Sequence, residues 1–367
     1  CFQKKDTIGK YYILMKRVIL TGGGTGGHCL PIQVMFNSLC QKKIECYIVT
    51  DQRGKSFFRS IDRDKVITIW QPIETNRRIS QLINLPILFI QSMMIFLRLK
   101  PNFTIGFGGF ITFPFLLSGS FLRYKIAAHE ANSILGNANK FLMRRIKYLF
   151  TAFDKTQNIN KKFLKKTIHV GMPIRIYKSL GHMKNHTNRD FKICVIGGSQ
   201  GAKSFSDFIP HAIIKLQNDN KFRFSVDHQV RKEELNYVRN IYKSSGIENN
   251  VKEFFSDMPR RILESDLIIS RAGSSTVNEI IHYGKPSILI PYPYAADNHQ
   301  YYNALELKKL LISQIILHKN LSVKKIYVEI LKIIKNKIKR KYTNTQVSKV
   351  RNLSPSEKMF NLIRNEI

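Results

Sequence analysis

Two distant parts of the chain share one pattern, a short apolar segment that runs into a glycine-rich loop and then into a helical pattern. The first loop, residues 21–28, follows the apolar segment 18–20, and the second loop, residues 197–203, follows the segment 191–196. A strand, a glycine loop and a helix in this order open a parallel βαβ unit. Because the pattern occurs twice, about 175 residues apart, the sequence predicts an α/β fold with two doubly wound, Rossmann-like domains in tandem.

The length of the chain agrees with two domains, since its 367 residues allow domains of roughly 100–200 residues each. We expect a first domain at residues 15–175 and a second at residues 176–350, with the polar segment 178–190 as a linker. Met15 stands directly before the first predicted strand, so residues 1–14 are expected to form an extension outside the fold.

Basic residues strongly outnumber acidic ones. The chain has 60 Lys+Arg and 25 Asp+Glu, which gives a formal net charge of +35 and a sequence isoelectric point near 10.1. Such a charge favours anionic partners, namely nucleic acid, phosphorylated substrates or an anionic membrane surface. Compositional drift in an AT-rich genome would enrich Lys in the same way, and both explanations stay open. Because the basic residues are spread along the chain, we expect no nucleic-acid partner.

The cysteines and the first residues indicate the compartment. The five cysteines form no Cys-x-x-Cys pair, which argues against a zinc ribbon or a secreted disulfide scaffold. The first residues lack the continuous apolar core of a secretory signal peptide. We therefore expect a reducing, cytoplasmic environment.

The longest apolar stretch, residues 82–99, is interrupted by polar residues and by Pro86. It is a poor match to the roughly 20 apolar residues of a membrane-spanning helix, so we expect a core or interfacial helix. Basic residues flank it on both sides: Arg77, Arg78, Arg98 and Lys100. An apolar helix with flanking cations would suit contact with an anionic membrane surface.

The glycine loops alone leave several anion-binding functions open, because backbone N–H groups at a helix start can hold a phosphate in any of them. Gly22, Gly24 and Gly27 match the dinucleotide spacing G-x-G-x-x-G, and Asp51 follows the second predicted strand, where a ribose-binding acid would lie. An NAD-dependent oxidoreductase is therefore an alternative. The second loop differs from a nucleotide-binding P-loop, because Ala202 replaces the glycine before the lysine.

Further polar segments follow predicted strands, and in a parallel sheet such segments meet at the carboxyl edge, where ligands bind. Together with the glycine loops they resemble the MurG family, bacterial enzymes that add N-acetylglucosamine to lipid I to make lipid II. The segments that carry the resemblance, in family order, are 23–28, 108–110, 129–132, 173–175, 197–202, 273–279 and 299–300. The family usually has Gln and Asn at two positions where this chain has Ala131 and Met172.

The resemblance implies a GT-B fold, in which two Rossmann-like domains enclose an interdomain cleft. It also implies an inverting glycosyltransferase that moves N-acetylglucosamine from UDP-N-acetylglucosamine to lipid I, undecaprenyl-diphosphate-N-acetylmuramoyl-pentapeptide. The carboxyl half would bind UDP-N-acetylglucosamine, and the amino half would bind the acceptor and the cytoplasmic face of the inner membrane. A helix at 355–367, whose start is indicated by Ser354 and Pro355, would pack back on the first domain.

The resemblance also assigns roles to single residues. By similarity, Glu279 accepts hydrogen bonds from the ribose, Phe255 contacts the uracil through its backbone, and His299 and Gln300 face the sugar. The expected UDP-N-acetylglucosamine site comprises Thr25, Gly26, Gly27, Asn132, Arg175, Ser199, Phe255, Ser274, Ser275, Thr276, Val277, Asn278, Glu279, His299 and Gln300. The expected acceptor diphosphate site comprises Gly23, Gly24, Gly108 and Gly109.

His28 is the candidate catalytic residue, because it ends the first glycine loop and histidine, with an ordinary pKa of about 6.5, can take a proton near neutral pH. It would act as the general base for the acceptor hydroxyl. The alternative that His28 only holds the loop or touches the acceptor diphosphate stays open. A helix N-terminus can stabilise the departing UDP diphosphate, so we expect no required cofactor, although a loosely bound Mg²⁺ is compatible with the sequence.

Overall fold

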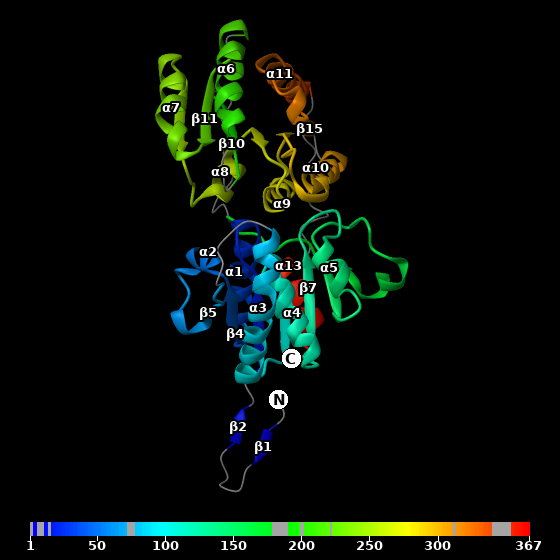
Figure 1. The fold of residues 1–367 in the computed structure, drawn as a ribbon. Coiled ribbons are helices and arrows are strands. Elements are labelled where there is room, and N and C mark those ends of the chain that lie inside the picture. The colour runs from blue at the N-terminus through cyan, green and yellow to red at the C-terminus, as the bar shows by residue number, and fades with distance from the viewer. Residues whose placement is uncertain are drawn as a thin grey trace. The chain divides into compact units, whose positions relative to one another are not determined.

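The computed structural model describes residues 3–5, 11–13, 16–71, 78–177, 190–198, 202–220, 222–310, 313–339 and 354–367. The chain forms two compact units, and Figure 1 labels many of their helices and strands. The first unit consists of Cys1–Ala131, Leu135–Pro173 and Leu353–Ile367. The second unit consists of Asn132–Ile134 and Ile174–Asn352.

The first unit contains a seven-stranded parallel sheet in the order β5-β4-β3-β6-β7-β8-β9. The direction in which strands are added reverses between β3 and β6, as in a doubly wound fold. The strands are β3 (Arg17–Thr21), β4 (Glu45–Thr50), β5 (Val66–Thr68), β6 (Phe103–Gly106), β7 (Ile126–Glu130), β8 (Tyr148–Thr151) and β9 (Thr167–His169). The helices are α1 (Gly26–Gln41), α2 (Gln52–Lys55), η1 (Ser56–Phe58), η2 (Arg63–Lys65), α3 (Arg78–Leu99), α4 (Thr112–Phe121), α5 (Asn137–Leu142), η3 (Lys161–Lys166) and α13 (Pro355–Ile363).

The second unit repeats this plan with a six-stranded parallel sheet in the order β12-β11-β10-β13-β14-β15. The strands are β10 (Phe191–Ile196), β11 (Phe224–Gln229), β12 (Glu248–Lys252), β13 (Leu267–Ser270), β14 (Ser287–Leu289) and β15 (Ser313–Ile315). The helices are α6 (Lys203–Asn220), η4 (Lys232–Glu234), α7 (Leu235–Ser244), α8 (Met258–Glu264), α9 (Ser274–Tyr283), η5 (Ala296–Asn298), α10 (His299–Leu310), η6 (His318–Asn320) and α11 (Val323–Lys339). The predicted fold class is therefore confirmed in both units.

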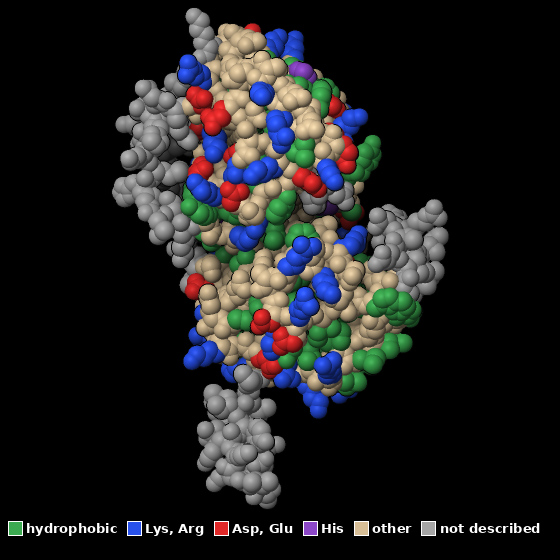
Figure 2. Space-filling view, turned by 90° about the vertical axis from the view of Figure 1, so that its left-hand side faces the viewer, with side chains coloured by type: hydrophobic (Ala, Val, Ile, Leu, Met, Phe, Trp, Pro, Cys, Tyr) green, Lys and Arg blue, Asp and Glu red, His purple; other side chains and the backbone are tan. Residues whose placement is uncertain are grey.

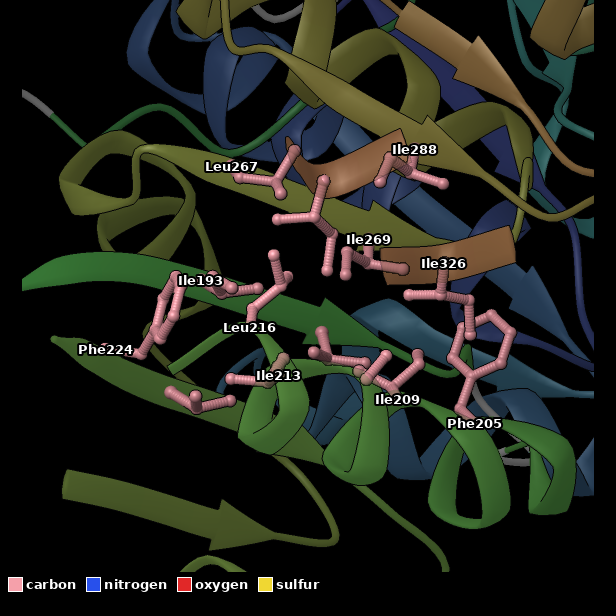
Figure 3. Packing of buried hydrophobic residues seen from close by; sticks show 14 of the residues in the cluster. Ile193, Phe205, Ile209, Ile213, Leu216, Phe224, Leu267, Ile269, Ile288 and Ile326 are labelled. Carbon is pink, nitrogen blue, oxygen red and sulfur yellow. The ribbon is translucent and has the colours of Figure 1, made fainter. Parts of the chain in front are cut away.

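The core of the second unit lies between its sheet and α6. Residues spaced by about one helical turn, such as Ile209 and Ile213, lie on the face of α6 that packs against strand residues including Ile193 and Ile269 (Figure 3). These four side chains are completely buried. Strands covered on both faces consist of almost continuous apolar residues, which is why 191–196 can be recognised from the sequence.

Helix α3 has one buried face and one exposed face. Leu88 and Phe96 are completely buried, whereas Ile90, Met94 and Leu97 are 58%, 64% and 55% exposed. The expected helix at 82–99 therefore contributes to the core and also leaves apolar side chains at the surface. Among the described residues, no helix is both long and apolar enough to cross a bilayer.

Both ends of the chain contain regular structure. Strands β1 (Gln3–Lys5) and β2 (Tyr11–Ile13) pair antiparallel with each other in a two-stranded sheet. Helix α13 begins as predicted, because the Ser354 hydroxyl accepts a hydrogen bond from the Glu357 N–H at 3.2 Å. Met359 and Ile363 of α13 are completely buried in the core of the first unit.

Candidate active site

In each sheet, two loops follow the strands at which the strand order reverses, which is where doubly wound folds bind ligands. In the first unit these are the loop 22–25 after β3 and the loop 107–111 after β6. In the second unit the loop after β13, residues 271–273, leads into α9. Ser199, in the loop after β10, lies outside the described residues.

The two glycine loops of the first unit pack directly against each other. The Gly23 N–H donates to the Gly108 carbonyl at 3.3 Å. Gly109 has a φ of +87°, and a Cβ atom there would lie 2.5 Å from the Gly23 carbonyl oxygen. Only glycine fits at position 109, because both the backbone conformation and the available space exclude a side chain.

Asp51 holds the first glycine loop by a hydrogen bond to its backbone. Its Oδ1 accepts hydrogen bonds from the Gly24 N–H at 3.0 Å and the Gly54 N–H at 2.6 Å, and the residue is only 1% exposed. The sequence offered Asp51 as the ribose-binding acid of an oxidoreductase. Because this carboxylate is buried and bonded to the loop backbone, that interpretation is wrong.

The amides of the first loop therefore have internal partners. Gly23 N–H and Gly24 N–H, both predicted to surround the acceptor diphosphate, donate to Gly108 and Asp51. Helix α1 begins two residues later, at Gly26, with Thr25 as its N-cap. Among the residues predicted to bind an anion in this unit, Gly26 and Gly27 lie in the first turn of α1. The positive end of the helix dipole at this turn favours a negatively charged ligand.

His28 is fixed in one tautomer by its hydrogen bond. Its Nδ1 lies 2.9 Å from the carbonyl oxygen of Phe107. Because a carbonyl can only accept, Nδ1 carries the proton, and in the neutral imidazole the lone pair is on Nε2. Gly108 makes room for the ring, since a Cβ atom at that position would lie 2.7 Å from it. His28 therefore has the protonation pattern that a general base requires.

A second histidine supports this arrangement. The ring of His129 stacks on the ring of Phe107, with 5.4 Å between the centroids. Its Nε2 donates to the Gly171 carbonyl at 2.9 Å, and burial lowers its pKa to about 4. His129 is therefore neutral at physiological pH, and it adds no positive charge beside His28.

In the second unit, α9 begins at Ser274 with Gly273 as its N-cap. Residues 274–276 form its first turn, which lies at the positive end of the helix dipole. Asn278 donates from its side chain to the Ser274 carbonyl at 2.9 Å, and Val277 is completely buried. These predicted residues therefore form and anchor a helix start that is suited to an anion.

Glu279 lies one turn further along α9 and is only 8% exposed. Burial raises the pKa of its carboxyl from the ordinary 4.5 to about 7, and the positive charge of Arg175 opposes this rise. Arg175 also donates to the Ser256 carbonyl at 3.3 Å. It thus connects the surroundings of Glu279 with the loop that contains Phe255, whose side chain is 2% exposed.

Gln300 and His299 fix the loops around the start of α9. The Gln300 side-chain oxygen accepts from the Ala272 N–H at 3.2 Å and the Tyr292 N–H at 2.9 Å. His299 Nδ1 donates to the Ala296 carbonyl at 2.7 Å. Gln300 therefore ties the end of β13 to the end of β14.

Asn303 of α10 connects loops of the second unit by hydrogen bonds. No role was assigned to it from the sequence. It is completely buried, and its Oδ1 accepts from the Ser133 N–H at 2.9 Å. Its Nδ2 donates to the Asn132 Oδ1 at 3.1 Å and to the Ala272 carbonyl at 3.2 Å. Asn303 thereby holds Asn132, a predicted site residue, beside the residue that precedes Gly273. A polar residue at a buried helix position was the only sequence signal.

The structure thus divides the predicted UDP-N-acetylglucosamine residues between the units. Thr25, Gly26 and Gly27 lie at the start of α1 in the first unit. The described others lie in the second unit, where α9, Asn303 and Gln300 organise them. The second unit therefore holds a helix start, a buried acid and a cationic residue close to the acid.

Two protein-domain families match this chain. The glycosyltransferase family 28 N-terminal domain matches residues 18–151, and the glycosyltransferase family 28 C-terminal domain matches residues 192–357. These ranges include most of the strands of both sheets. The fold and these matches define a two-domain glycosyltransferase.

Curated relatives narrow this class. The chain is similar to the UDP-N-acetylglucosamine–N-acetylmuramyl-(pentapeptide) pyrophosphoryl-undecaprenol N-acetylglucosamine transferase of Rickettsia bellii. The two proteins are 33% identical over 330 aligned residues, and the alignment covers 88% of this chain and 92% of that protein. This chain is also 34% identical over 317 residues to the protein of the same name from Agrobacterium fabrum, with 84% and 83% covered. The chain belongs to this family of transferases, the MurG family.

Solved structures share the fold. The crystal structure of MurG from Acinetobacter baumannii has a TM-score of 0.72 at 21% identity, covering 95% of this chain and 99% of that one. The calicheamicin glycosyltransferase CalG4 has a TM-score of 0.67 at 8% identity, covering 96% and 98%. These neighbours confirm the GT-B fold. No comparison supports the NAD-dependent oxidoreductase.

The raised pKa of Glu279 predicts a pH dependence of stability. Because the folded-state pKa, about 7, lies above the ordinary 4.5, the protonated carboxyl contributes stability that is complete below the ordinary value and is lost as the pH rises through 7. Glu279→Gln cannot ionise. Relative to this variant, the wild type should lose about 3 kcal/mol of unfolding free energy between about pH 4.5 and about pH 8.

Urea unfolding of both proteins across this pH range measures the difference. Glu248→Gln, at an exposed position of β12, is the matched control and should follow the wild type. A pH-independent difference between wild type and Glu279→Gln would contradict the raised pKa.

Proposed function

We propose that this chain transfers N-acetylglucosamine from UDP-N-acetylglucosamine to lipid I, which carries the acceptor sugar on an undecaprenyl diphosphate, and so forms lipid II in peptidoglycan synthesis. The names of its relatives describe this transfer. One observation carries the proposal: a single helix, α9, contains both the first-turn residues 274–276, where an anion would bind, and the buried acid Glu279. Residues four apart lie on the same helix face, so Ser275 and Glu279 would reach one nucleotide.

The donor would be held mainly by the second unit. The diphosphate would meet the N–H groups and hydroxyls at the start of α9, where the helix dipole favours negative charge. The ribose hydroxyls would donate to Glu279, and the uracil would contact the backbone at Phe255. Binding in this manner requires the Glu279 carboxylate, so donor binding would release a proton below about pH 7.

The acceptor would be activated by His28 in the first unit. Nε2 of His28 would take the proton of the acceptor hydroxyl. At the same time the hydroxyl oxygen would attack the anomeric carbon of N-acetylglucosamine. The bond between that carbon and the UDP oxygen would break with inversion, and the electron pair would leave on the diphosphate. Because Nδ1 is bonded to the Phe107 carbonyl, the resulting imidazolium would keep its orientation and gain a stronger hydrogen bond.

We propose further that the reaction needs no resident cofactor. The charge that develops on the leaving diphosphate would be stabilised by the start of α9, and preorganised backbone donors can supply such stabilisation without a metal. A loosely bound Mg²⁺ on the diphosphate is compatible with this arrangement.

The first unit would also contact the anionic cytoplasmic face of the inner membrane, with the chain attached peripherally. Apolar residues of α3 and α4 line a hollow of about 360 Å³: Leu85, Pro86, Phe89, Ile90, Phe113, Pro114 and Leu117. Arg98 and Lys100 are exposed beside the exposed Met94 and Leu97 of α3. Apolar surface with adjacent cations is typical of interfacial binding.

A nucleic-acid partner is not part of this proposal. On the face seen in Figure 2, Lys and Arg side chains are scattered among Asp and Glu side chains and do not gather in one stripe. Groove binding usually requires such a stripe.

Donor binding is the direct test of the proposed function. In calorimetric titrations the protein should bind UDP-N-acetylglucosamine in preference to UDP-glucose and NAD. Glu279→Ala should weaken this binding by about tenfold or more, because the ribose hydroxyls would lose a charged acceptor. Glu248→Ala is the control. Preference for NAD would contradict the function, and an unchanged dissociation constant in Glu279→Ala would contradict the ribose assignment.

The catalytic proposal predicts that His28→Ala loses at least about 100-fold in kcat, as expected for a lost general base. The affinity for UDP-N-acetylglucosamine should stay nearly constant, and the acidic limb of the pH profile of kcat should disappear. Steady-state kinetics with lipid I, with and without EDTA, measure these values. His211→Ala, at an exposed position of α6, is the control. If only the KM for lipid I rises, His28 is a binding residue.

The membrane proposal predicts weaker binding of the double variant Arg98→Gln/Lys100→Gln to vesicles that contain anionic lipid. A loss of about tenfold or more is expected, since each cation near such a surface contributes about 1 kcal/mol. Lys215→Gln/Lys243→Gln, at exposed positions of the second unit, is the control. Vesicle co-sedimentation measures binding, and unchanged binding would place the contact elsewhere. Arg77 and the Arg78 side chain lie outside the described residues.

A further inference from the structure

The loop between β12 and α8 lies at the carboxyl edge of the second sheet, beside the surroundings of Glu279. It begins after Lys252 and ends at Asp257, the N-cap of α8. Arg175 approaches it through the Ser256 carbonyl, at 3.3 Å. The same guanidinium is the positive charge that acts on Glu279. The loop is therefore adjacent to the proposed ribose site.

A second guanidinium, that of Arg261 on α8, contacts the other residues of this loop. Its Nε donates to the Asp257 carboxylate at 2.9 Å, and its central carbon lies 4.2 Å from the centroid of the Phe255 ring. The Arg261 side chain is only 14% exposed. A planar guanidinium can stack on a ring and donate in its plane at the same time.

The other end of this guanidinium is anchored in the sheet. Its Nη1 donates to Asp227 of β11 at 2.5 Å, and Lys192 of β10 lies 3.3 Å from the other carboxylate oxygen. The Asp227 side chain is 5% exposed. Breaking one partner from a buried ion pair leaves an uncompensated charge, which strongly favours the paired state. Arg261 thus joins a surface loop to β11, whose Asp227 also pairs with Lys192 of β10.

We propose that Arg261 is a positioning residue for donor selection, which holds the Phe255–Asp257 loop in the conformation that receives the pyrimidine base. This inference rests on the proposed function, since it takes UDP-N-acetylglucosamine as the donor. Backbone groups discriminate between bases only if they are held in place before binding, because ordering a loop during binding lowers affinity. Arg261 itself is directed at Phe255, Asp257 and Asp227 and acts through the loop.

The proposal predicts a specific pattern for Arg261→Ala. The dissociation constant for UDP should rise by about tenfold, because the loop would then have to be ordered during binding, and the preference for UDP over ADP should shrink by a similar factor. At saturating donor, kcat should stay within about twofold of the wild type. Arg260→Ala is the matched control, because the neighbouring Arg260 is 53% exposed and pairs with Glu264 on the surface of α8.

Two further variants test the role of Arg261 separately from its effect on folding. Arg261→Lys retains the charge but not the planar fork, so it should restore thermal stability more fully than the preference for UDP over ADP. If Arg261→Ala does not fold, Asp257→Asn carries the test, because it weakens the bond to the loop and leaves the Asp227 pair intact. A reduced preference for UDP in that variant supports the proposal.

A result that contradicts the role of Arg261 can be distinguished from a result that contradicts the proposed function. If a folded Arg261→Ala, or Asp257→Asn in its place, only lowers the melting temperature and keeps the wild-type preference for UDP over ADP, Arg261 is merely structural. That result overturns the inference while wild-type binding of UDP-N-acetylglucosamine, and its weakening in Glu279→Ala, still support the proposed function. If the wild type does not bind UDP-N-acetylglucosamine, both fail.

Discussion

The candidate site depends on parallel strands that are buried on both faces and end together at one edge of each sheet. In the first unit Thr21 of β3 is paired with Gly106 of β6, and in the second unit Ile196 of β10 is paired with Ser270 of β13. Burial of a strand fixes its register, so the loops that follow start from fixed positions. This constraint is what allows short loops to place an imidazole or a helix start reproducibly.

The buried carboxylates of this chain have different hydrogen-bond partners. Asp51 accepts two backbone N–H groups, and Asp227 accepts from a guanidinium. These hydrogen bonds hold the surrounding backbone and side chains in place. Glu279 has a nearby positive charge, yet burial dominates and raises its pKa to about 7. A buried carboxylate that is costly to ionise would be stabilised by a ligand that donates hydrogen bonds to it.

The glycines of the first unit show how one sequence signal can serve two purposes. The pattern around 21–28 indicates an anion-binding loop, and the start of α1 there is consistent with one. In the structure, however, Gly108 makes room for the His28 ring and Gly109 for the backbone of Gly23. Close packing of two loops therefore explains glycine at 108 and 109, and it also fixes the tautomer of His28 through the Phe107 carbonyl.

The sequence by itself determined the fold class, the two units and the loops at which chemistry is expected. It could do so because apolar strands, glycine loops and helical spacing are local patterns. Only the tertiary structure decided what each polar group contacts. Asn303 bonds to Ser133, which lies 170 residues away, and Arg261 bonds to Asp227 across 34 residues. Such partners are brought together by sheet order, and burial then sets their energies, so neither can be deduced from local sequence.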